Sequence, residues 1–116
     1  MKTSVLCEAV YREACEETSA FYRRMIEEES LDAVRDPLWK KIIQLARALD
    51  TTDRETLIAF AKQASIDAVS TVFGGIDGNT SLAGQFFSLT LVDGEGRQHA
   101  GDLQDEFLCL AQSREV

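Results

Sequence analysis

The residue best suited to acid–base chemistry is the single histidine of the chain, His99. Histidine exchanges protons near neutral pH, and common catalytic sites pair such a base with a nucleophile or with a carboxylate that orients it. Asp77 and Asp102 are the carboxylates considered as partners, in a small enzyme or ligand carrier. No cysteine or serine is specifically placed beside His99, so we interpret it as a partly exposed surface histidine and predict no catalytic residues.

Two glycine-rich turns invite a metal or phosphate interpretation, and both interpretations fail. The segment 77–81 places oxygens at the first, third and fifth positions of a calcium loop, but Leu82 replaces the loop glycine and Ser88 replaces the bidentate glutamate. The segment 74–78 follows a predicted helix, whereas a dinucleotide-binding turn follows a strand and opens a helix. We predict no bound metal ion and no nucleotide.

Three cysteines, Cys7, Cys15 and Cys109, make an odd number without a CxxC pair. A structural zinc site needs four ligands, and a disulfide framework favours an even number in a short secreted chain. We interpret the three thiols as small buried or half-buried hydrophobic groups, and we predict no cofactor.

The first two-thirds of the chain show the three- and four-residue spacing of amphipathic helices. The first helix is predicted over residues 3–29, with a bend near Thr18 and Ser19. Asp36 and Pro37 are typical of an N-cap and a first helical position, and they open a second helix that ends near residue 50. Thr52 and Glu55 fit a capping box for a third helix, which Gly74 and Gly75 should end.

From Gln85 the period of the apolar residues changes to two, which predicts a β-hairpin over about residues 85–100. Its apolar side, formed by Phe87, Leu89 and Leu91, must pack on the helices, pair with a further strand, or pair with another copy of the chain. Asp102 should cap a final helix. The predicted fold is therefore α+β and mainly α: three N-terminal helices, the hairpin and a C-terminal helix, in a single domain spanning residues 1–116.

The net charge of −8 is concentrated in the second half of the chain. Residues 1–62 hold 12 acidic and 10 basic side chains, whereas residues 63–116 hold 8 acidic and 2 basic ones. Such a surface repels a phosphate backbone and attracts a basic protein. We expect no nucleic acid partner. Without a membrane-spanning stretch or a secretory signal, we also expect no membrane association and a cytoplasmic protein.

These features favour a small acidic protein-binding module that occupies a basic surface of a partner protein. By size and charge, it is of the same general type as bacterial immunity proteins and antitoxins, which inhibit toxins in this way. One alternative is a secretion or assembly chaperone that forms a homodimer with a hydrophobic groove. The predicted contact residues combine acidic side chains with one exposed aromatic ring: Asp77, Phe86, Asp93, Glu95, Asp102, Asp105 and Glu106.

Overall fold

A computed structural model describes residues 1–114, and it confirms a mainly helical α+β fold. The first predicted helix is a continuous rod made of three segments: α1 (Thr3–Tyr11), the π-helical turn η1 (Arg12–Glu17) and α2 (Thr18–Glu28). The wider π-helical turn lies just before the predicted bend, and the Thr18 hydroxyl donates to the Glu13 carbonyl oxygen at 3.0 Å. A 3₁₀ turn, η2 (Leu31–Ala33), then leads to α3 (Pro37–Ala48).

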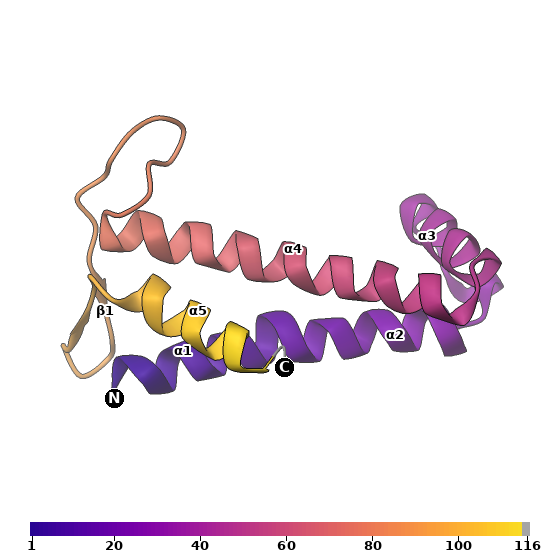
Figure 1. The fold of residues 1–116 in the computed structure, drawn as a ribbon, viewed down its shortest axis with the longest axis horizontal. Helices are drawn as coiled ribbons and strands as arrows, with labels where there is room; N and C mark the ends of the chain where they lie inside the picture. Colours follow the sequence, from indigo (N-terminus) through magenta and orange to yellow (C-terminus); the bar gives the residue numbers. More distant parts are fainter. Residues whose placement is uncertain (115–116) are drawn as a thin grey trace.

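The long helix α4 (Thr51–Asp77) lies alongside this rod (Figure 1). The C-terminal helix α5 (Leu103–Arg114) packs against α1 and α4 at one end, and α3 lies at the opposite end. The main core is therefore at the α5 end and consists of Cys7, Tyr11, Cys15, Ile66, Phe73, Leu103, Phe107 and Ala111. A smaller cluster at the α3 end contains Ile26, Ala46 and Ile58.

The N-terminus of α3 is as predicted, and that of α4 is not. The Asp36 carboxylate accepts hydrogen bonds from the backbone N–H of Leu38 at 2.8 Å and of Trp39 at 3.3 Å. At α4 the N-cap is Asp50, which accepts from the Asp53 N–H at 2.8 Å. The predicted capping box is wrong because its glutamate is bound to an arginine of α2 instead.

The glycine pair at positions 74 and 75 does not end α4, which continues to Asp77 and stops at Gly78 with φ +83°. The pair is needed for close packing. A Cβ on Gly74 would lie 2.2 Å from the Thr80 hydroxyl oxygen, and one on Gly75 would lie 2.6 Å from a Leu82 methyl carbon. The segment after α4 therefore folds back directly onto the end of the helix.

The hairpin is present at the predicted place, with strands β1 (Leu91–Val92) and β2 (Gln98–His99) paired antiparallel. Leu91 packs against the main core, but Phe87 and Leu89 are exposed. The preceding residues form an open loop that rises beyond the end of α4 (Figure 1). Of the three arrangements considered for the apolar side, packing on the helices is therefore found only for Leu91, because residues 86–90 belong neither to a strand nor to the core.

Candidate functional site

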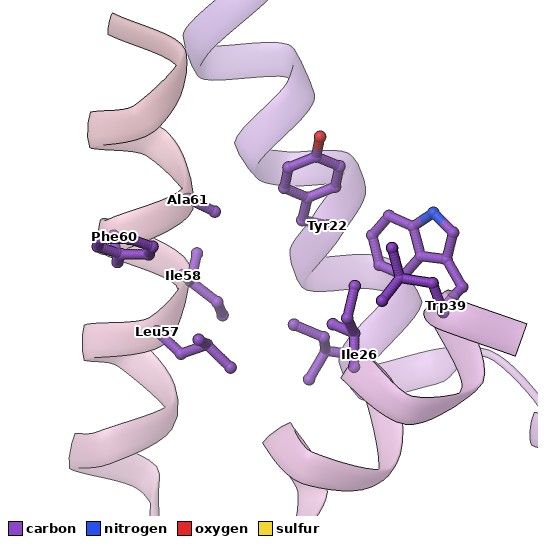
Figure 2. Close-up of a pocket in the computed structure, with 9 residues that line it drawn as sticks. Tyr22, Ile26, Trp39, Leu57, Ile58, Phe60 and Ala61 are labelled. Atoms are coloured by element: carbon purple, nitrogen blue, oxygen red, sulfur yellow. The ribbon is translucent and has the colours of Figure 1, made fainter. Parts of the chain in front are cut away.

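An apolar groove of about 360 Å³ lies at the α3 end, between α2, α3 and α4. Figure 2 shows Leu57 and Ile58 of α4 pointing across it toward Ile26 of α2, with Trp39 of α3 at its side. None of its nine lining residues carries a charge at neutral pH. They are Tyr22, Ile26, Leu38, Trp39, Ile42, Leu57, Ile58, Phe60 and Ala61.

Contacts with α2 fix one wall of the groove. The Trp39 ring lies 5.2 Å from the Tyr22 ring and 6.2 Å, edge-on, from the Phe21 ring, measured between centroids. At the other end of α3, the Arg47 Nε donates to the Ile26 carbonyl oxygen at 2.8 Å, and the same guanidinium bonds to the Glu29 carbonyl. These contacts hold α3 against the C-terminal end of α2 and satisfy carbonyl groups that the helix leaves free.

The opposite wall is fixed by Arg54 and Glu55 at the start of α4. The Arg54 Nε donates to the Ala46 carbonyl oxygen at 3.0 Å, which ties α4 to the end of α3. The Arg23 guanidinium of α2 binds both oxygens of Glu55, with one Nη2–Oε2 distance of 2.8 Å. The three helices are thus linked at their ends, and the apolar space between them is left open.

The mouth of the groove exposes two large apolar side chains, Phe60 at 70% and Leu38 at 65% of their surface. Burying a side chain of this size contributes about 1.5–3 kcal/mol, so leaving both in water forgoes a substantial stabilisation. The volume is in the range of small-molecule sites and also suits two or three apolar side chains of a polypeptide. The arrangement is therefore suited to receiving apolar groups.

Sequence reasoning missed this groove because apolar spacing places Trp39 and Phe60 on helices without showing what covers them. The available signal was the composition of the third predicted helix. Its apolar residues exceed one face, and a helix that is apolar on several sides is normally buried on several sides. Figure 2 shows Phe60 on the side of α4 away from α2, and 70% of its surface is exposed.

The predicted contact residues gather at the other end of the molecule, and two of them have internal roles. The Asp77 carboxylate accepts from the backbone N–H of Gly101 at 2.7 Å, Leu103 at 3.2 Å and Gln104 at 2.8 Å. Asp77, and not Asp102 as predicted, therefore supplies the cap of α5. The Asp93 side chain is 8% exposed and bonded to His99.

The other predicted contact residues remain partly or fully accessible. Glu95, Asp102 and Asp105 are exposed, and Phe86 is 70% exposed in the loop after α4. Glu106 is half-buried, and its Oε2 is buried without a hydrogen-bond partner. A contact surface built from these residues would be smaller than the predicted one.

His99 is buried, at 1% exposure, so the interpretation as a partly exposed residue is wrong. Its Nε2 donates to Asp93 Oδ2 at 2.9 Å, and its Nδ1 is hydrogen-bonded to the Thr3 hydroxyl at 2.8 Å. The expected partners Asp77 and Asp102 are not in this set. Both ring nitrogens form hydrogen bonds that hold the hairpin against the start of α1, so the role of His99 in this arrangement is structural.

This arrangement predicts a specific dependence of stability on pH. The His99 hydrogen bond, followed by the backbone N–H groups of Arg97 and Glu95 and the terminal ammonium, holds the pKa of Asp93 well below its ordinary value of 3.8. The folded state therefore binds this proton less readily than the unfolded state. Its stabilising effect is complete above about pH 4 and is lost as the pH falls through the lowered pKa.

Asp93→Asn is the test of this prediction. We expect the variant to be less stable than wild type at neutral pH, with a smaller difference at about pH 2, in urea unfolding followed by circular dichroism. Glu95→Gln is the matched control because Glu95 is exposed in the same turn, and its pH profile should follow wild type. A difference between Asp93→Asn and wild type that is independent of pH contradicts the assignment.

The cysteines behave as small hydrophobic groups at two of the three positions. Cys7 and Cys15 are buried as expected, and burial together with nearby carboxylates raises the pKa of Cys7 to about 11. Cys109 is exposed, which corrects the expectation for that residue. Within residues 1–114, no three histidine, cysteine or acidic side chains are grouped to hold a metal ion. No helix in this range has the length and apolar character needed to cross a bilayer.

Three comparisons with known proteins identified no relative of this chain. No protein-family model matches the chain. No curated protein and no solved structure matches it either. Function is therefore inferred from the residues themselves.

Proposed function

We propose that this protein is a polypeptide-binding module whose groove receives an apolar segment of another chain. The observation that carries the proposal is the open, uncharged groove with Phe60 and Leu38 exposed at its mouth. Apolar anchors in a preformed pocket supply most of the binding energy in many protein interfaces. The walls are already fixed by the contacts of Trp39, Arg47 and Arg54, so little ordering would be required on binding.

This proposal is closer to the groove-bearing assembly chaperone than to an inhibitor that acts through charge alone. A second candidate function, contact with a basic partner protein, is supported by the exposed carboxylates of Glu95, Asp102 and Asp105. The turn between β1 and β2 and the start of α5, which carry these residues, lie at the opposite end of the molecule from α3, so one chain can use both surfaces. The immunity-type inhibitor is one form of this second candidate.

Photo-crosslinking from the mouth of the groove tests the proposal. The photoreactive amino acid p-benzoylphenylalanine, placed at Phe60, should give covalent adducts with polypeptides in cells. The same group at Gln63, an exposed position one turn away on α4, should give few. Mass spectrometry of the adducts from Phe60 should identify an apolar segment as the crosslinked peptide.

A second substitution checks that the adducts depend on the groove. Leu38→Asp introduces a charge at the mouth from α3, at an exposed position where folding should be unaffected, and should reduce adduct formation at Phe60 at least about tenfold. Equal labelling from Phe60 and Gln63, or labelling that persists in Leu38→Asp, would overturn the proposed function.

A further inference from the structure

We infer that the polypeptide received by the groove is the loop Phe86–Leu89 of a second copy of this chain, in an antiparallel two-fold dimer. The inference rests on the proposed function, because it names the occupant of the same groove. Three observations support it: the large surface area of the single chain, an uncharged and exposed face of α4, and the relative positions of the groove and the loop.

The single chain exposes more surface than a compact monomer of its mass. Its accessible surface is 7549 Å², whereas about 6,300 Å² is typical of a 12.9 kDa monomer. Its radius of gyration is 17.1 Å, against about 13 Å for a compact domain of this length. The excess of roughly 1,200 Å² is sufficient for one side of a stable dimer interface, which needs about 800 Å² per partner.

Helix α4 presents an uncharged face on the side away from Ile66 and Phe73. The buried face contains Ile58, Ile66 and Phe73. Residues at three- and four-residue steps on the other side form a stripe without any charged side chain: Leu57, Phe60, Ala61, Ala64, Ala68, Thr71 and Val72. The small side chains at Ala64 and Ala68 lie in the middle of this stripe and would allow a second helix to approach closely.

The groove and the loop are placed so that a two-fold axis would bring each to the other. In Figure 1, α3 and the loop after α4 rise on the same side of α4, at opposite ends. Ala68 is nearly equidistant from Leu57 in the groove and from Gly78 at the base of the loop, about 15 Å along the helix in either direction. A two-fold axis near Ala68 therefore places each loop beside the groove of the other copy.

The loop has the composition that this site requires. Residues 78–92 contain no charged side chain, in a chain of which 28% is charged. Phe86, Phe87 and Leu89 are exposed, and residues 86–90 belong to no strand. Within residues 1–114 these residues neither pack on the helices nor pair with a further strand, which leaves pairing with another copy among the three arrangements considered. Two chains of net charge −8 repel each other at long range, and contact between uncharged surfaces adds no local repulsion between like charges.

Sedimentation velocity of the purified protein tests the association. At about 50 µM, wild type should sediment as a dimer of about 26 kDa, twice the mass of one chain. Ala68→Glu should raise the dissociation constant at least about a hundredfold, because it places an unpaired charge in the interface. Ala9→Glu, the same change at an exposed position of α1, should remain dimeric. Circular dichroism verifies that both variants keep their helix content.

Disulfide trapping tests the arrangement, in protein whose exposed Cys109 is replaced by serine. Leu38→Cys protein mixed with Phe86→Cys protein should form a crosslinked dimer on mild oxidation. Leu38→Cys protein alone should not, because the two-fold axis places the two copies of Leu38 at opposite ends. Phe86→Asp, in a loop outside the core, should weaken the dimer as Ala68→Glu does.

Each result decides the inference separately from the proposed function. A wild-type monomer at about 50 µM, or a dimer without the mixed Leu38–Phe86 crosslink, would overturn the inference. If Phe60 adducts then contain an apolar segment of a different protein, the proposed function stands with another occupant. Dimerisation sensitive to Ala68→Glu, together with the mixed crosslink, supports the inference.

Discussion

Replacing Phe107 with alanine is expected to lower the free energy of unfolding by about 3–5 kcal/mol. The side chain is fully buried between α1 and α4, with ring centroids 5.9 Å from Tyr11 and 5.7 Å from Phe73. Its removal loses both edge-to-face contacts and leaves a cavity in the main core. Because small domains are stable by only about 5–15 kcal/mol, the variant should unfold at much lower urea concentration.

Two further substitutions make this measurement decisive. Phe107→Leu keeps most of the volume and should cost less than about 1.5 kcal/mol. Val5→Ala, at an exposed position of α1, should change stability by less than about 0.5 kcal/mol. All proteins are compared at one concentration, since association stabilises the folded chain. An unfolding midpoint for Phe107→Ala equal to that of Val5→Ala would contradict the position of the core.

The parts of the fold that depend on neighbouring residues were predictable from the sequence. The helices over residues 3–28 and 37–48 follow from three- and four-residue apolar spacing, and the Asp36–Pro37 start was correctly identified. The hairpin position followed from the change of period and from the turn residues after Val92. In each case, the information lies within one or two turns of chain.

Contacts between distant segments were not predictable in this way. His99 is hydrogen-bonded to Thr3, which is 96 positions away in the sequence, and the cap of α5 is Asp77 at the end of α4. The sequence analysis had considered Asp77 and Asp102 as partners of His99, and Asp102 as the cap of the last helix. The observed partners differ because a buried polar group forms hydrogen bonds with whichever donors and acceptors tertiary packing places near it, irrespective of their distance in sequence.

The groove was not predicted from the sequence for a different reason. Apolar residues on a helix indicate burial, but they do not indicate what buries them. Helix α4 has apolar residues on opposite faces, and only the face bearing Ile66 and Phe73 is covered within the described residues. The other face, with Phe60 and Ala68, is exposed in the single chain, and we propose that it belongs to an interface between two copies.

The two candidate surfaces are compatible within one assembly. In the proposed dimer, the uncharged face of α4 and the loop are covered, while Glu95, Asp102 and Asp105 are distant from the groove. The dimer would carry its acidic side chains in two copies, and paired binding sites increase the avidity for a partner with two basic sites. The uncharged surfaces would then serve assembly, and the acidic ones would serve recognition.

Asp77→Ala is expected to destabilise the protein by about 2 kcal/mol, the upper range for loss of a helix cap. The Asp77 carboxylate accepts three backbone N–H groups at the start of α5, and its negative charge lies at the positive end of that helix. Without it, these N–H groups lose their partner in a partly buried site. Hydrogen exchange of Gln104 and the first turn of α5 should accelerate more than that of α3.

The comparison with Asp102→Ala separates a structural carboxylate from one available for contacts. Asp102 is exposed beside the same helix start, and its removal should change stability by less than about 0.5 kcal/mol. Asp77→Asn keeps one acceptor oxygen without the charge, so its stability should lie between those of wild type and Asp77→Ala. If Asp77→Ala and Asp102→Ala were equally stable, the cap would be supplied by another group. The predicted role of Asp77 in partner binding would then be open again, because its carboxylate would be free to contact a basic surface.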